Sequence, residues 1–524
     1  MHLHYRFLRN SPRAAATGDN VLSNQILSLK RMAASYHFLS VLIAIAIRAI
    51  PEALMGPWPS GFDVITYYAP YIYDVKTYGF LFPLLRIINE QTAPLTYLML
   101  SFVGYTSPLS SVLTAKIMSP LIYGFLAFAV YLFVEDLFKW EPRKVFFATV
   151  MTVIYFVCLR FSWDMWKNML GLAFFLLAVR YFEREEYGRF TVYSVLCILT
   201  HEVMTILLGS VLAVLLSKDM FIRRGRPLNR RKMLALTSVA CLAFIGAGYY
   251  SGFIRLFPAP KPSIPLELLS SVSPMTIPYN YLGNGDWYNY TSENNVRIEA
   301  STLMIKMYGP ILPLAILGWT RDEWMNSYVV VASLPFISVI LAPRMAIPAW
   351  HRFAFLLTVP LTIYAANFLF ERKKLRRSCL VLLAVFAFGY AVLPPEFAFP
   401  YYVLFPVTYQ YMPTSMLQNS VSQADLANVE KSLTWLSSNA GENSCLLTHE
   451  SYLGWARLYI NREDMTIVPY NLSSTTPAAA EKFYAQVYLI WWARNMSWYD
   501  WSPPAQFSQI NQIGRISIYK YVNN

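Results

Sequence analysis

The chain has 524 residues, of which 56% are hydrophobic and only 14% are charged, and its mean hydropathy is +0.37. This composition excludes an ordinary soluble globular protein and predicts a multi-pass protein of the cell membrane. The formal net charge is +13, but the basic residues lie in short stretches between apolar runs, so we expect membrane lipids and no nucleic acid as their partners.

Residues 1–32 form a basic segment before the first apolar run, at 33–50, and no small-residue cleavage pattern follows that run. Basic flanks of membrane helices remain on the cytoplasmic side. We therefore expect a cytoplasmic N-terminal tail and a retained membrane anchor.

Apolar runs predict an all-α transmembrane domain over 33–393, with about eleven membrane-spanning helices and with outer loops at 51–108 and 251–301. The runs lie at 33–50, 109–134, 145–159, 169–181, 191–216, 233–250, 302–319, 328–341, 353–370 and 379–393.

Two segments decide the topology. The run 93–104 is about a dozen residues long, shorter than the ~20 that a helix needs to cross ~30 Å of hydrocarbon, so we expect it in the outer interface. The run 191–216 is longer than one span requires and contains His201 and Glu202, whose burial at the bilayer centre would cost roughly a few kcal/mol. We expect two helices there, joined by a turn at the outer face, which also keeps the neighbouring basic loops in the cytoplasm.

The first outer loop carries an isolated acid, Asp63, in the Trp-, Tyr-, Pro- and Gly-rich stretch 51–70. Tyr67 and Tyr68 follow it and offer aromatic faces for a sugar at the depth of the lipid headgroups. Asp63 is therefore a candidate base. The alternative is that it only caps a helix that begins at Val64.

The same topology places further polar residues on the face that carries Asp63. They are Asp164, Lys167, His201, Glu202, Arg344 and Arg352. Their plainer explanations are an acid at a helix start, an interfacial lysine, a polar turn between two helices, and arginines that only snorkel to the interface.

Residues 394–524 are polar, and by parity they lie outside the cell, so we expect a small extracytoplasmic α/β domain. Ser422 and Asp425 resemble a capping box that opens a helix. Further elements are predicted as strands at 444–448, 465–468 and 515–522 and as a helix at 476–493.

The order of these features resembles the GT-C superfamily of membrane glycosyltransferases, which use polyprenyl-phosphate sugars, and is similar to its mannosyl-, aminoarabinose- and arabinofuranosyltransferase type. The resemblance implies a GT-C-like membrane domain and transfer of a single sugar. The stretches that carry it are Gly61 to Asp63, Ala93 to Tyr97, Trp163 to Gly171, Leu199 to Glu202 and, more weakly, Trp350 to Phe353. The WWDYG element of oligosaccharyltransferases of this fold is not matched by Trp491 to Asn495.

An inverting sugar transfer needs a carboxylate to take the proton of the acceptor hydroxyl and positive charge to hold the departing lipid phosphate. We expect Asp63 to be the base, with Asp164 as a second catalytic residue. The two carboxylates could also share a Mg²⁺ or Mn²⁺ ion, since carboxylate oxygens suit both metals.

The remaining candidates bind substrate, and the acceptor is a glycan, a lipid or a protein. Cationic side chains suit the donor phosphate, and the others would orient these groups or contact a sugar. The cationic candidates are Lys167, Arg344 and Arg352, and the others are His201, Glu202, Tyr67 and Tyr68.

Other functions remain open at this point. A transporter or flippase of lipid-linked sugars would want charged residues or broken helices at the membrane midplane, whereas the polar residues here gather on one face. An oligosaccharyltransferase-like enzyme and a non-catalytic scaffold are further alternatives. Substitution of Asp63 would separate an enzyme from a scaffold.

Overall fold

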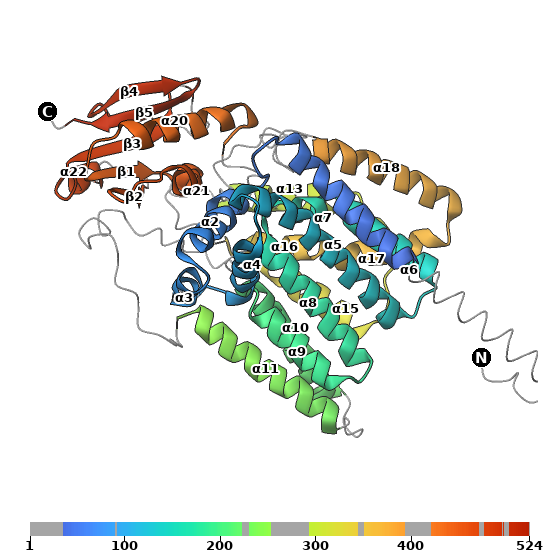
Figure 1. Ribbon diagram of the computed structural model, residues 1–524. Helices are drawn as coiled ribbons and strands as arrows, with labels where there is room; N and C mark the ends of the chain where they lie inside the picture. Colours follow the sequence, from blue (N-terminus) through green and yellow to red (C-terminus); the bar gives the residue numbers. More distant parts are fainter. Residues whose placement is uncertain are drawn as a thin grey trace, which may run out of the picture.

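The computed structural model describes residues 35–89, 92–222, 230–252, 293–343, 350–392, 421–470, 476–494, 496 and 502–522. These residues form a bundle of helices with a small sheet-containing domain at one end of it (Figure 1). The predicted tail 1–32, Arg344 and most of the predicted loop 251–301 lie outside the described residues.

The helices begin and end close to the predicted apolar runs, because proline and short polar residues bound those runs. At the start of α15, for example, the Asp322 carboxylate accepts a hydrogen bond from the backbone N–H of Met325 (2.8 Å). The long elements of the bundle are a first helix (Ser35–Leu54), α5 (Ser111–Phe138), α6 (Pro142–Ile154), α7 (Phe156–Asp164), α8 (Trp166–Glu183), α9 (Tyr187–Ile198), α10 (Glu202–Ile222), α11 (Arg230–Tyr250), α13 (Glu293–Tyr308), α14 (Leu312–Leu317), α15 (Glu323–Leu341), α16 (Trp350–Leu356), α17 (Thr358–Phe370) and α18 (Lys373–Val392).

Six helices in the described part of the chain are long and apolar enough to cross a membrane, namely Ser35–Leu54, α5, α11, α15, the α16–α17 stretch and α18. A seventh span arises if α6 and α7, which meet at a bend of 59°, count as one. Large apolar side chains on these helices, such as Phe244 (81% exposed) and Leu341 (73% exposed), form the kind of surface that lipid covers.

The predicted number of about eleven spans is not confirmed. Some apolar runs fold as shorter or more polar helices: α8 carries Lys167, Arg180 and Glu183, and the run 302–319 divides between α13 and α14. Helix length therefore departs from the apolar pattern where charged residues or breaks interrupt it.

The two segments that decide the topology form the helices that the sequence predicts, and their places relative to the membrane remain predictions. The run 191–216 forms α9 and α10, which are separated at residues 199–201, and the run 93–104 forms the 13-residue helix α4 (Pro94–Thr106). The backbone N–H of Leu95 donates to the carbonyl of Leu199 (2.9 Å), so the short helix α4 is tied to the turn between α9 and α10.

Three further elements follow the first helix, and one of them, α2 (Ala69–Tyr78), lies between the bundle and the sheet domain (Figure 1). They are the π-helix η1 (Val64–Tyr68), α2 (Ala69–Tyr78) and α3 (Leu81–Asn89). The Tyr71 hydroxyl and the Ser101 hydroxyl share a hydrogen bond of 2.7 Å, which holds α2 on α4.

The C-terminal domain contains a five-stranded mixed sheet in the order β2-β1-β3-β5-β4, in which the first three strands are parallel and the last two antiparallel. Its elements are α20 (Leu426–Asn439), β1 (Ser444–Thr448), α21 (Glu450–Tyr459), β2 (Met465–Pro469), α22 (Thr476–Glu481), β3 (Gln486–Trp492), β4 (Phe507–Ile513) and β5 (Ile516–Tyr521).

Two predictions for this domain are wrong. The predicted helix 476–493 ends as α22 at Glu481, and the rest becomes the central strand β3, because its apolar and aromatic residues are buried between β1 and β5. A strand covered on both faces loses the alternating pattern that would have identified it. The Ser422 hydroxyl does not cap a helix but donates to the Asp425 carboxylate (2.9 Å).

Candidate functional site

A buried ionic network joins the end of the first helix to the end of α7. Arg48 donates from Nη2 to Glu52 Oε1 (2.8 Å) and from Nε to the carbonyl of Ser162 (3.2 Å). The Ser60 backbone N–H and hydroxyl both donate to the Glu52 carboxylate, at 3.1 and 2.7 Å. Both charged side chains are almost fully buried, so a paired arginine and glutamate fix the loop that leads to Asp63.

Gly61 brings this loop into direct contact with α7. Its φ of +108° lies in the region that favours glycine, and a Cβ there would come within 2.9 Å of the Trp163 carbonyl carbon and closer still to its oxygen. Asp63 lies two residues after Gly61, and Asp164 directly follows Trp163. The segments that carry the two predicted catalytic residues therefore meet at Gly61 and Trp163, while the side chain of Asp164 lies outside what the structure describes.

Asp63 is 7% exposed and directly precedes η1. Its side chain makes no capping hydrogen bond to that helix, so the plainer explanation of Asp63 as a helix cap is wrong. π-Helices are rare in proteins, and those that occur often lie at functional sites.

Tyr68 links the carboxylate to the cationic side of the site. Its ring stacks on Trp166, with centroids 4.6 Å apart and planes at 10°, and lies 6.3 Å from the ring of Tyr97. Burial raises the pKa of the Tyr68 hydroxyl well above its usual value, the Asp63 charge raises it further, and the Arg352 charge opposes both. The charges of a carboxylate and a guanidinium from distant stretches thus shift the pKa of one buried hydroxyl in opposite directions.

Two cationic side chains, one on α8 and one on α16, lie near Tyr97 and His201. Lys167, on the first turn of α8, has its Nζ 5.2 Å from the centre of the Tyr97 ring. Arg352, on α16, has Nη1 2.8 Å from His201 Nε2, and that nitrogen lies 3.4 Å from Glu202 Oε1.

His201 occupies the turn between α9 and α10 and is fully buried. Burial lowers the pKa of His201 to about 3. The charge of Glu202 raises this pKa, and the charges of Arg352 and Lys167 lower it further, so the ring is neutral near pH 7. The backbone N–H of Val203 lies 3.0 Å from Nδ1, and Arg352 faces Nε2. A neutral imidazole has one acceptor nitrogen, so it accepts from only one of these donors at a time.

Most of the predicted site residues with described side chains lie in one cluster, whereas Tyr67 stands apart from it at 42% exposed. The clustered residues are Asp63, Tyr68, Lys167, His201, Glu202 and Arg352. Their roles in catalysis and binding remain predictions.

Sequence reasoning did not name three contributors as site residues, although two of them lie in stretches that carry the resemblance. Tyr97 and Trp166 line the site with their rings, and the Arg48–Glu52 pair holds its loop. The sequence could have indicated the Arg48–Glu52 pair. Two opposite charges four residues apart at the end of an apolar run predict an ion pair, because burying either charge alone is costly.

The predicted Mg²⁺ or Mn²⁺ site is neither supported nor contradicted. Within the described residues, no group of three or more His, Cys, Asp or Glu side chains is arranged to hold a metal ion. Asp164, one of the two predicted ligands, has no described side chain, so the metal remains a prediction.

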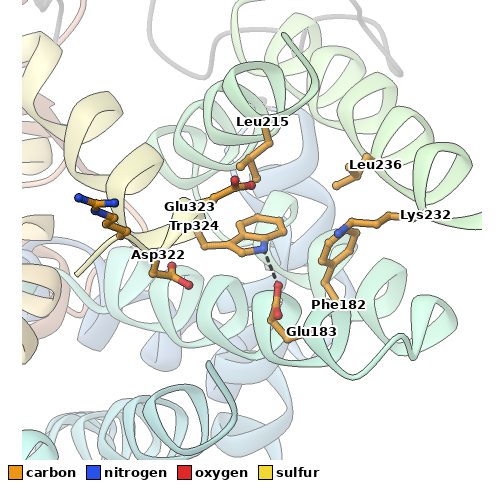
Figure 2. A pocket seen from close by; sticks show the side chains of 9 residues that line it. Phe182, Glu183, Leu215, Lys232, Leu236, Asp322, Glu323 and Trp324 are labelled. Atoms are coloured by element: carbon orange, nitrogen blue, oxygen red, sulfur yellow. Dashed lines mark hydrogen bonds between the residues drawn. The ribbon is translucent and has the colours of Figure 1, made fainter. Parts of the chain in front are cut away.

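A cavity of about 260 Å³ lies elsewhere, at the far end of α8 from Lys167 (Figure 2). It is lined by Phe182, Glu183, Leu215, Lys232, Leu236, Arg321, Asp322, Glu323 and Trp324. Trp324 Nε1 donates to Glu183 Oε1 (2.9 Å) inside it. Lys167 and Glu183 are about 24 Å apart along a helix that rises ~1.5 Å per residue, so this cavity is separate from the cluster around Asp63.

Comparisons with known proteins establish no family for the chain. No protein-family model matches it, and no curated protein matches it. Among solved structures, the cryo-EM structure of the arabinofuranosyltransferase AftD from Mycobacteria is similar over 92% of this chain, with a TM-score of 0.46 and 11% sequence identity. That match covers 40% of the AftD chain, so this chain spans well under half of its length, and a likeness this distant establishes neither family nor activity.

Proposed function

We propose that this chain is a membrane glycosyltransferase that moves a sugar from a polyprenyl-phosphate donor to an acceptor hydroxyl on the extracytoplasmic face, with inversion at the anomeric carbon. One observation carries the proposal. Tyr68, on the helix that follows Asp63, stacks on Trp166 next to Lys167 and lies 6.3 Å from the ring of Tyr97, which Lys167 Nζ approaches to 5.2 Å. The charges of Asp63 and Arg352, almost 290 residues apart in the chain, shift the pKa of the buried Tyr68 hydroxyl in opposite directions. A base beside a cationic group is the pair that this reaction requires.

Asp63 is the base in this mechanism. It takes the proton of the acceptor hydroxyl while that oxygen forms a bond to the anomeric carbon. The bond from the anomeric carbon to the phosphate oxygen breaks on the opposite side, and its electron pair leaves with the polyprenyl phosphate. Asp164, whose backbone is brought to the same place, is proposed to orient the acceptor.

The departing phosphate is held by Lys167 and Arg352. A guanidinium offers a fork of donors that fits two phosphate oxygens, and the lysine adds a point charge. His201 is neutral and therefore leaves the charge of Arg352 intact. The negative charge of Glu202, 3.4 Å from His201 Nε2, offsets part of the positive charge of Lys167 and Arg352. The rings of Tyr68, Tyr97 and Trp166 form a buried apolar wall beside Lys167.

The test is a turnover assay with the purified full-length protein in lipid nanodiscs. A panel of polyprenyl-phosphate sugars is supplied with short glycan acceptors, and release of polyprenyl phosphate is measured. We expect release with at least one donor, and we expect Asp63→Asn to lower the rate by about 10²-fold or more. Asp74→Asn, at a half-buried position of α2, is the control and should retain the rate.

Two outcomes would overturn the proposal. One is turnover that Asp63→Asn leaves unchanged. The other is transbilayer movement of an intact lipid-linked sugar without release of the phosphate, which would identify a flippase. An EDTA arm tests the metal: if Asp63 and Asp164 share Mg²⁺ or Mn²⁺, the chelator lowers the rate and the added ion restores it.

A further inference from the structure

Helix α21 of the C-terminal domain packs directly on the π-helix that follows Asp63. A Cβ at Gly454, in the middle of α21, would lie 2.6 Å from both the Ile65 carbonyl carbon and the Thr66 Cα, and closer still to the Ile65 carbonyl oxygen. All of these atoms belong to the backbone of η1, which cannot move aside as a flexible side chain can. Only glycine permits this approach.

The place of contact follows from the sequence of η1. In a π-helix a carbonyl accepts from the N–H five residues ahead, and the Ala69 N–H donates to Val64 in this way. The next carbonyl, that of Ile65, would need the N–H of Pro70, and proline has none. Gly454 lies against that carbonyl, where a Cα–H can offer it a weak hydrogen bond.

The contact continues along α2. Gly454 meets Ile65, and Asn461, just beyond the end of α21, accepts a hydrogen bond from the hydroxyl of Tyr73 (3.4 Å). The step of seven residues from Gly454 to Asn461 thus matches the step of eight residues from Ile65 to Tyr73, so the two stretches run side by side in the same direction. Figure 1 shows α21 on the side of the C-terminal domain that faces α2.

The domain also holds the loop before Asp63. Trp58 Nε1 donates to Glu430 Oε2 on α20 (2.9 Å), and Gln423 Nε2 donates to the carbonyl of Leu54 (3.0 Å). The side chains of Met55 and Ile65 are buried within the hydrophobic core of the C-terminal domain. The segment around Asp63 is therefore fixed from both sides by a domain that starts more than 350 residues later in the chain.

We propose that the C-terminal domain sets the position of the catalytic base, and that Gly454 is the positioning residue through which it acts. Gly454 fixes η1, and η1 carries Asp63 at its start and Tyr68 at its end. The cations Lys167 and Arg352 stand on α8 and α16, outside the backbone of η1 that Gly454 contacts. The inference rests on the proposed function for its kinetic part, but the placement of η1 can be measured without turnover.

The experiment compares Gly454→Ala with Gly318→Ala in the full-length protein. A Cβ at Gly318 would meet the backbone of Tyr364 (2.8 Å) and Phe368 (3.0 Å), an equally severe collision between α14 and α17. Tyr364 lies twelve residues beyond Arg352, about 18 Å along the helices, so this control disturbs packing and not the site. Both variants are studied at a temperature at which they remain folded.

We expect Gly454→Ala to lower kcat by about 10²-fold while the KM for the donor stays unchanged, because a displacement of about 1 Å of a catalytic group has that effect. Gly318→Ala should retain kcat. Hydrogen exchange of the backbone amides at 61–69 should become faster in Gly454→Ala alone. Equal exchange in the two variants would overturn the inference, whatever the assay of activity gives.

A second variant covers the case in which Gly454→Ala does not fold. Glu430→Ala removes the half-buried hydrogen-bond partner of Trp58. We expect a smaller decrease in kcat and a smaller increase in hydrogen exchange at 61–69 than in Gly454→Ala. If the wild type shows no turnover, the proposed function fails while exchange still decides the inference. If Asp63→Asn abolishes turnover but Gly454→Ala and Glu430→Ala behave as the wild type, the inference alone fails.

Discussion

The guanidinium of Arg352 lies 2.8 Å from the imidazole of His201, although the two residues are 151 positions apart in the chain. The contact joins the turn between α9 and α10 to α16. Because the imidazole is buried and neutral, it holds the arginine in place without cancelling its charge.

Replacement of this arginine tests its role with the donor phosphate. We expect Arg352→Ala to lower kcat/KM by about 10²-fold or more, as loss of a group that stabilises developing negative charge does. Arg352→Lys keeps the charge but loses the fork, so it should recover only part of that loss. Arg372→Ala is the control, since that guanidinium lies over the Phe368 ring away from the site. Equal kinetics for Arg352→Ala and the wild type would exclude the role.

The buried pair of Arg48 and Glu52 should be important for stability. We expect Glu52→Gln to lower the free energy of unfolding by about 3–5 kcal/mol, because it leaves a buried guanidinium without its anion. Glu186→Gln breaks a pair of similar geometry with Arg189 at the surface and should cost about 0–1 kcal/mol. Thermal unfolding in detergent, followed by tryptophan fluorescence, measures both. A cost for Glu52→Gln no larger than that of the control would contradict the prediction.

Gly61 should tolerate no side chain. Gly61→Ala combines a positive φ with a collision against the Trp163 carbonyl, so we expect loss of both stability and turnover. Gly56→Ala separates the two causes, because Gly56 has a φ of +64° but nothing within 4 Å of its Cβ position. The control should lose only about 1–2 kcal/mol of stability and keep its turnover. If both variants retain the same activity, the contact with Trp163 does not position the loop.

The stability of the C-terminal domain should depend on pH through His449. Burial lowers the pKa of this residue from 6.5 to about 4. Between these two values the unfolded chain binds more protons than the folded chain, so stability is complete above pH 6.5 and falls as the pH drops toward 4, by up to about 3 kcal/mol.

His449→Asn provides the comparison. His449 accepts a hydrogen bond from the Ser451 N–H at the start of α21, and asparagine can replace that cap without a titrating group. Melting temperatures measured between pH 4 and 7.5 should fall less steeply in His449→Asn than in the wild type. Parallel curves would show that His449 is not the group responsible.

The elements that local pattern controls were predictable. The break at 199–201 and the short helix after Ala93 follow from polar residues or length within a few positions. The strand β3 was not, since Gln486–Trp492 has the apolar character of a buried helix and becomes a strand only because β1 and β5 lie on either side of it. The number of about eleven spans is not confirmed for a related reason, because apolar composition alone does not fix where a helix breaks.

The sequence by itself determined that the chain is rich in apolar helices and ends in a domain of mixed strands and helices, because hydrophobicity and its period are properties of neighbouring residues. It also pointed to Asp63, Lys167 and Arg352 as unusual charges beside apolar runs. Only the tertiary structure decided that Tyr68, on the helix after Asp63, stacks on Trp166 beside Lys167, and that Gly454 lies on the backbone of Ile65. Such contacts join stretches hundreds of residues apart, and they depend on how helices and domains pack against one another, which no local pattern contains.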